Sequence, residues 1–105
     1  MSKIDTFKAM LEKGQDNALL RYSLGSAYFA DKQFHAAAEH LDSAVQQDEG
    51  YSAAWKLLGR SYMESGDYSS AIAALERGIA VALDKGDKQA EKEMTVFLRR
   101  AKKNV

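Results

Sequence analysis

The chain lacks cysteine and proline, and neither sign of charge is in excess. Its 105 residues include 15 lysines and arginines against 15 aspartates and glutamates. Without cysteine the chain can form neither disulfides nor thiolate metal sites. Balanced charge gives no reason to expect nucleic acid or an anionic membrane as a partner. No apolar run approaches the roughly 20 residues that span a membrane, and no apolar stretch resembles a secretory signal. We therefore expect one cytoplasmic, α-helical domain without a membrane segment.

A short motif recurs at a spacing of 34 residues. Leu24-Gly25-x-x-Tyr28 returns as Leu58-Gly59-x-x-Tyr62, and similar residues continue to match downstream. A fixed period of this length indicates stacked helical repeats, in which each unit buries its apolar face against its neighbours. The residues that define the repeat are Leu24, Gly25, Tyr28, Phe34, Ala37, Trp55, Leu58, Gly59, Tyr62, Tyr68 and Ala71.

The spacing of apolar residues predicts helices over 3–13, 18–31, 53–65 and 87–103, with further helices that begin near Phe34 and Tyr68. Glycine inside a helix costs about 1 kcal/mol relative to alanine, so the recurring Gly25 and Gly59 need a packing reason. We expect the paired helices to approach closely there, facing Ala37 and Ala71.

The turn before Tyr68 has residues suited to ending one helix and starting another. Gly66 can adopt the left-handed conformation that ends a helix, and Asp67 can cap the next one. The equivalent residues, 34 positions earlier, are Lys32 and Gln33. Neither suits its position, so the first turn is predicted to be strained if the two backbones match.

The two ends of the repeat region depart from the full pattern. Residues 3–13 match the second helix of a unit that lacks its first helix. In the last helix, a shift of 36 residues places Met94, Thr95 and Leu98 where Leu58, Gly59 and Tyr62 stand. We expect the preceding helix to be about two residues longer for this reason. The predicted organisation is a single domain, 1–105, with an N-terminal half repeat (1–14), full repeats at 18–49 and 52–85, and a capping helix (86–105).

These residues resemble the tetratricopeptide repeat. Trp55-x-x-Leu58-Gly59-x-x-Tyr62 matches its helix-turn-helix pattern, although Arg21 stands where the first repeat should carry tryptophan and the usual proline is absent. The resemblance implies an all-α, right-handed superhelical stack of antiparallel helix pairs, about six helices in all. It also implies a non-enzymatic adaptor that binds a protein or peptide in a concave groove lined by the first helix of each pair.

No motif for catalysis or cofactor binding is present in the sequence. The chain has no phosphate-binding glycine loop, no zinc-protease motif and no nucleophile elbow. His35 and His40 are five residues apart, so they lie on different faces of a helix and do not form a ligand pair. We therefore expect no catalytic residue, no metal and no cofactor.

The candidate peptide-binding residues lie on one face of the first helices. By the resemblance they face the groove, aromatic at one end and basic at the other: Tyr22, Ser26, Phe29, Lys56, Arg60, Met63, Lys92, Val96 and Arg99. Such a groove predicts a peptide that carries an acidic group or a free carboxylate and an apolar anchor. The alternative is that the charges are solvated, with Glu64 neutralising Arg60, and that the aromatic rings only complete the packing.

Two further expectations concern the partner. Some members of the family bind acidic chaperone tails through a clamp of lysines, asparagines and an arginine, but the aligned positions here are Tyr22, Ser26, Leu57, Gln89 and Glu93. That ligand is not predicted. The alternative function is structural, with homo-oligomers formed through the terminal helices. An exposed Phe97 would favour it, whereas inward packing of Met94, Phe97 and Leu98 would favour a capped monomer.

Overall fold

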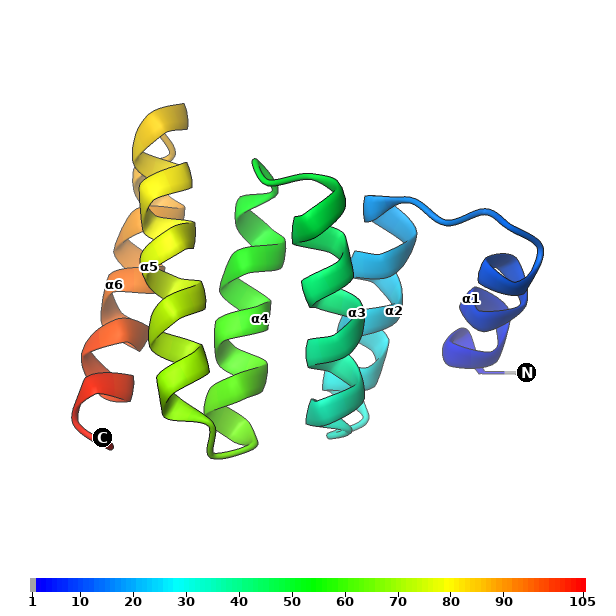
Figure 1. Ribbon diagram of the computed structural model, residues 1–105, viewed down its shortest axis with the longest axis horizontal. Helices are drawn as coiled ribbons and strands as arrows, with labels where there is room; N and C mark the ends of the chain where they lie inside the picture. The colour runs from blue at the N-terminus through cyan, green and yellow to red at the C-terminus, as the bar shows by residue number, and fades with distance from the viewer. Residues whose placement is uncertain (1) are drawn as a thin grey trace.

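The computed structural model describes residues 2–105 and shows an all-α fold. The six helices of this part of the chain are α1 (Lys3–Glu12), α2 (Ala18–Ala30), α3 (Phe34–Gln47), α4 (Ser52–Glu64), α5 (Tyr68–Lys85) and α6 (Lys88–Lys102). Figure 1 shows them as successive antiparallel rods, with α1 at one end of the stack and α6 at the other. The bounds of α1, α2, α4 and α6 agree with the predicted ranges to within a single residue.

Most helices begin at a side chain that caps the free backbone N–H groups. Ser2 Oγ accepts a hydrogen bond from Asp5 N at 3.1 Å, and Asn17 Oδ1 accepts one from Leu20 N at 2.8 Å. Asp67 and Asp87 cap α5 and α6 in the same way. Each such cap stabilises its helix by about 1 kcal/mol relative to alanine. The cap expected at Asp67 is confirmed.

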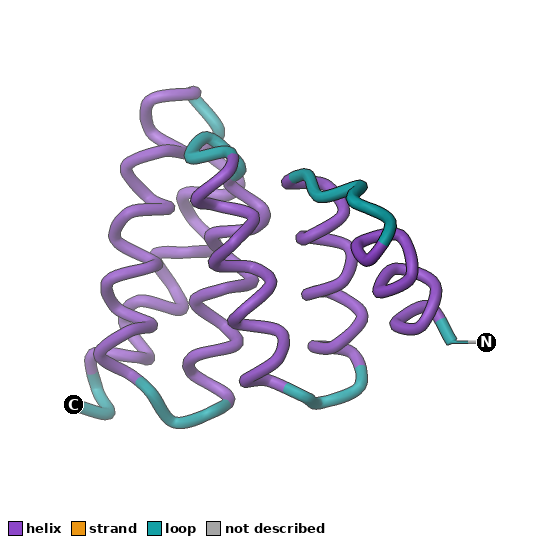
Figure 2. Tube along the Cα trace, turned by 45° about the vertical axis from the view of Figure 1, so that its right-hand side comes forward, coloured by secondary structure: helices purple, strands orange, loops and turns teal. Residues whose placement is uncertain are grey.

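The helices pack as pairs, α2 with α3 and α4 with α5, and the stack measures 39 × 28 × 18 Å. The first helices of the pairs also meet one another, since α4 contacts both α2 and α6. Among the described residues α1 packs only on α2. Figure 2 shows α1 beside α2 at the edge of the stack.

The core is built from equivalent positions of the repeats. Leu24 and Met94 are fully buried and Leu58 is almost so, which places one large apolar residue at the centre of α2, α4 and α6. Leu41 and Leu75 of the second helices are also fully buried. Met94 is buried like Leu58, as the shift of 36 residues proposed for the last helix predicts.

The close approach expected at the motif glycines is present, but its partners differ in part from those predicted. A Cβ on Gly25 would lie 2.6 Å from Cγ of Leu41, and a Cβ on Gly59 would lie 2.6 Å from Cγ and Cδ2 of Leu75. The predicted approach to Ala37 is also present, since its carbonyl oxygen lies 3.2 Å from a Cβ on Gly25, while the three atoms nearest to a Cβ on Gly59 all belong to Leu75 and not to the predicted Ala71. The leucine one turn later reaches across because its side chain is long enough to fill the space over the glycine.

The extra residues before the last helix are distributed differently from the prediction. Helix α5 has 18 residues against 14 in α3, so it is four residues longer rather than about two. The link that follows α5 is shorter, residues 86–87 against 48–51 after α3. Gly86 makes the short link feasible, since it adopts φ +71° and ends α5 at once.

The two turns within the helix pairs share one backbone geometry. Lys32 has φ +60° and Gly66 has φ +81°, and Lys32 is the only non-glycine residue with positive φ in the described chain. The following residues make equivalent bonds, from Gln33 N to Tyr28 O at 3.0 Å and from Asp67 N to Tyr62 O at 2.9 Å. Asp67 caps α5, whereas Gln33 makes no capping bond to α3. The expected strain in the first turn therefore has a structural basis.

Replacing Lys32 by glycine together with Gln33 by aspartate is expected to stabilise the protein by about 1 kcal/mol. Glycine removes the steric cost of the left-handed conformation, and aspartate supplies the missing cap. Thermal or urea unfolding measures the change. The converse pair, Gly66→Lys with Asp67→Gln, is the matched control and should lower stability by a similar amount. An unchanged or lower melting temperature of the first variant would contradict this account of the turn.

Candidate binding groove

Arg60 lies at the centre of the surface formed by the first helices. Its guanidinium carbon is 4.9 Å from the ring centroid of Phe29, on α2, and 5.3 Å from that of Phe97, on α6. A cation over an aromatic face gains about 0.5–2 kcal/mol, and contact with two rings restricts the orientation of the guanidinium plane. Three neighbouring helices therefore hold one arginine in place.

Arg60 has no acidic partner within the described residues. No carboxylate of residues 2–105 lies within ion-pair distance of its guanidinium, so the expected neutralisation by Glu64 does not occur. Stacking against rings satisfies the faces of the guanidinium but not its N–H donors, which lie in its plane. Arg60 is thus a positioned cation with unused hydrogen-bonding capacity.

Lys56, one turn before Arg60, is already paired. Its Nζ lies 3.2 Å from Oε1 of Glu93 on α6, with both side chains partly exposed. A pair of this kind contributes little to stability but reduces the net charge of the surface around it. The end of the groove that the sequence predicts to be basic is therefore less basic than expected.

The aromatic end of the predicted groove is engaged in packing. The rings of Tyr22 and Tyr51 are 4.9 Å apart, and those of Phe29 and Phe34 are 5.2 Å apart in an edge-to-face arrangement. Tyr22, Phe29 and Met63 are half-buried and pack against the core. Of the three, Phe29 contacts Arg60 directly, and all three leave part of their surface accessible.

The other predicted groove residues lie at the margins. Lys92, Val96 and Arg99 are exposed on α6, with Val96 at 45%. The α6 residues that contact Lys56 and Arg60 are instead Glu93 and Phe97, one position after Lys92 and Val96. Ser26, on α2, lines a cleft between α1 and α2.

Glu93 and Phe97, which contact Lys56 and Arg60, were not among the candidate binding residues predicted from the sequence. Adjacent first helices meet diagonally, so a residue on one helix contacts a different repeat position on the next. With the 36-residue shift, Glu93 and Phe97 are equivalent to Leu57 and Ser61, which are both buried. Comparing equivalent positions of the repeats therefore does not reveal these contacts. They could have been predicted by also considering, on the next first helix, the residue one position after each equivalent residue.

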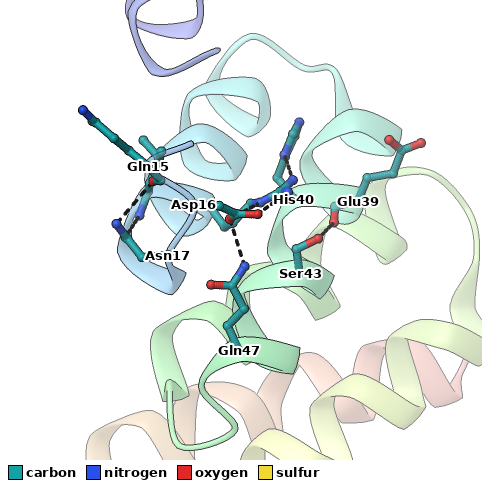
Figure 3. A network of polar contacts seen from close by, with 9 residues as sticks. Gln15, Asp16, Asn17, Glu39, His40, Ser43 and Gln47 are labelled. Atoms are coloured by element: carbon teal, nitrogen blue, oxygen red, sulfur yellow. Dashed lines mark hydrogen bonds and ion pairs between the residues drawn. The ribbon is translucent and has the colours of Figure 1, made fainter. Parts of the chain in front are cut away.

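A polar network replaces the tryptophan that the first repeat lacks (Figure 3). Arg21, equivalent to Trp55, donates to both carboxylate oxygens of Asp16, at 2.8 and 2.9 Å. Its remaining terminal nitrogen is 3.1 Å from Nδ1 of His40, and Gln47 donates to Asp16 at 2.9 Å. The network joins the α1–α2 link to both helices of the repeat. In the second repeat, Trp55 joins the preceding link to α4 by donating to the carbonyl of Glu49 at 2.8 Å.

The network perturbs the acid–base behaviour of its members. Hydrogen bonds from Arg21 and then Gln47 hold the pKa of the Asp16 carboxyl well below its ordinary value. Burial, followed by the charge of Arg21, lowers the pKa of His40. The imidazole of His40 stacks on Tyr28, with ring centroids 5.4 Å apart. Contacts within the network account for the pKa shifts of both Asp16 and His40. His40 is on α3, away from the surface that the first helices form around Arg60.

Residues 2–105 contain neither a cluster of metal ligands nor a helix that could span a membrane. No group of three or more histidine, aspartate or glutamate side chains in this part of the chain is arranged to hold a metal ion. None of its helices is both long enough and apolar enough to cross a bilayer.

Comparison with known proteins identifies the family. The family model of the tetratricopeptide repeat matches residues 28–91. A TPR repeat-containing protein of Pseudomonas aeruginosa is 54% identical over 97 residues, which cover 92% of each chain. The solution structure of protein BPP2914 from Bordetella parapertussis superposes with a TM-score of 0.83 at 44% identity, covering 98% of this chain and 90% of that one.

A more distant relative is larger. The heat-shock protein cognate (HSC) co-chaperone sgt12 of Aspergillus fumigatus is 34% identical over 76 residues, which cover 72% of this chain but only 22% of the co-chaperone. Proteins of this family generally mediate protein–protein interactions. The family match and the six stacked helices together establish that the chain belongs to the tetratricopeptide repeat family.

Proposed function

We propose that this protein is a non-enzymatic adaptor that binds a peptide or protein segment in the groove around Arg60. The observation that carries the proposal is the guanidinium held between Phe29 and Phe97 without an acidic partner in the described chain. A charge kept in a fixed orientation loses little conformational entropy on binding, which favours its use in recognition.

The chemistry of Arg60 favours a carboxylate as the polar element of the ligand. A guanidinium can donate two parallel hydrogen bonds to a carboxylate, and the aromatic rings that flank it limit competition from water. The half-buried Tyr22, Phe29 and Met63 offer an apolar surface for a neighbouring side chain. Lys92, Val96 and Arg99 would extend the site along α6. The ligand class that fits is a peptide with a carboxylate next to an apolar anchor.

The acidic tail of a heat-shock chaperone is not the ligand we propose, although one relative is a co-chaperone. Of the aligned positions, Ser26 and Leu57 carry no charge and Glu93 is acidic. Glu93 is also paired with Lys56 and would repel an acidic tail. Arg60 alone offers an unpaired cation at the centre of the groove.

Replacing Arg60 by glutamate is expected to abolish capture of a partner that the wild-type protein captures from a lysate of the source organism. Reversal of charge removes the carboxylate contact and adds repulsion, which together cost several kcal/mol of binding energy, on the order of a hundredfold or more in affinity. Captured proteins are identified by mass spectrometry.

Arg77→Glu is the matched control because Arg77 is also an arginine near an aromatic ring, 5.9 Å from that of Trp55, but lies on α5. This control should retain the partner, and circular dichroism should show that both variants are folded. If the Arg60 variant captures the same partner at wild-type levels, the groove assignment is wrong.

A further inference from the structure

A cleft between α1 and α2 lies where a first helix would pack if the unit containing α1 were complete. The cleft has a volume of about 860 Å³, and its α2 side is formed by small residues that include Ser23, Ala27 and Ala30. Ser23 and Ala27 are equivalent to Leu57 and Ser61 of α4. In α4 those positions are buried, whereas in α2 they line an open cleft.

The opposite wall of the cleft is the apolar side of α1. Ile4 and Phe7 line it, and neither is fully buried. Helix α1 has no buried residue at all among its ten. By contrast Leu41, equivalent to Phe7, is fully buried because it packs over Gly25 of its own first helix. The helix that would cover Phe7 in the same way is absent from the described chain.

Met94, Phe97 and Leu98 of α6 pack inward, so Phe97 is not the exposed residue that was expected to favour self-association. The opposite edge of α6 nevertheless carries a surface that matches this cleft. In the stack, Lys56 and Arg60 of α4 face Glu93 and Phe97 of the next first helix. On α6, the residues equivalent to Lys56 and Arg60 are Lys92 and Val96, and both are exposed. On α2, the residues equivalent to Glu93 and Phe97 are Ser23 and Ala27, which line the cleft. The exposed side of α6 and the cleft side of α2 are therefore equivalent to the two helix sides that contact each other between α4 and α6.

We propose that α6 of one copy of this protein docks in the α1–α2 cleft of a second copy. The contact continues the row of first helices, α2, α4 and α6, across the molecular boundary. It places Val96 of α6 over Ala27 and Lys92 beside Ser23, and it brings Arg99 to the end of α2, where Asp31 lines the cleft. Because the two surfaces differ, the interface is head-to-tail and the assembly can grow at both ends.

The test uses two variants that each block one surface. Ala27→Arg fills the cleft, and Val96→Arg places a charge on the docking edge of α6. Arginine is a good helix former, and neither residue is fully buried, so both variants should fold. Ala80→Arg, at an exposed alanine on α5, is the matched control. Mass is measured by light scattering and sedimentation velocity up to millimolar concentration.

The wild type and Ala80→Arg are expected to increase in mass steadily with concentration, whereas each blocking variant alone stays monomeric. A mixture of the two blocking variants should form a species of two chains and no larger, since one retains its α6 edge and the other its cleft. Wild type that remains monomeric, or assembly that either blocking variant leaves unchanged, would overturn the proposal. Arg60→Glu should not affect assembly, because Arg60 lies outside the docking surfaces, which share only Lys92, Val96 and Arg99 with the proposed peptide groove.

Discussion

Replacing Leu75 by alanine should lower the free energy of unfolding by about 3 kcal/mol. Leu75 is fully buried and lies against Gly59, where α4 and α5 approach closely. The substitution removes the buried methyl groups and leaves a cavity that the packed helices can fill only in part. In a protein of this size, a loss of that magnitude is a large fraction of the total stability.

Urea unfolding followed by circular dichroism measures this loss. Leu83→Ala is the control, because Leu83 lies on the same helix but is 60% exposed. That variant should change stability by no more than about 0.5 kcal/mol. Equal losses for the two substitutions would show that the packing of α5 against α4 is not as described.

Gly59→Ala is expected to lower the free energy of unfolding of the wild-type protein but to raise that of the Leu75→Ala variant. In the wild-type protein a Cβ at residue 59 would lie 2.6 Å from two carbons of Leu75, well inside van der Waals contact. Relieving that overlap requires the helices to shift, which costs about 1–3 kcal/mol. In the Leu75→Ala background those carbons are gone, and alanine instead gains up to about 1 kcal/mol of helix propensity over glycine.

The four proteins of this cycle are the wild type, the two single variants and the double variant. The cycle isolates the interaction between residues 59 and 75 from the separate effects of each substitution. We expect the double variant to be more stable than Leu75→Ala alone. Additive losses would mean that Gly59 is required for a reason other than the approach of Leu75.

The structure at the repeated positions could be predicted because the same residue type occurs at the equivalent position of both repeats, and each has a single physical reason to be there. Leu24 and Leu58 fill the centre of a helix pair, and a glycine follows each because a leucine of the partner helix lies over it. The strained turn at Lys32 could be predicted in the same way, since Gly66 in the second copy shows what the backbone requires. Comparison of the copies thus reveals the local geometry.

The groove was less predictable because its contacts are not repeated. The pairing of Lys56 with Glu93 and the position of Phe97 against Arg60 depend on how α6 crosses α4, which a list of equivalent positions does not contain. The expected basic end is partly neutralised, and the expected aromatic end is partly packed. Arg21 is a further example, since its departure from tryptophan makes sense only with Asp16 and His40 beside it.

The most direct test of the groove is to map where a bound peptide lies. Peptides with free carboxyl termini are selected against the wild-type protein from a random library, and a selected peptide is titrated into isotope-labelled protein while amide and methyl NMR signals are followed. We predict that signals of Phe29, Arg60, Met63 and Phe97 change most, that those of Arg77 and Ala73 on α5 stay unchanged, and that amidation of the peptide terminus weakens binding. Changes confined to α3 and α5, or none around Arg60, would contradict the assignment of the groove as the binding surface.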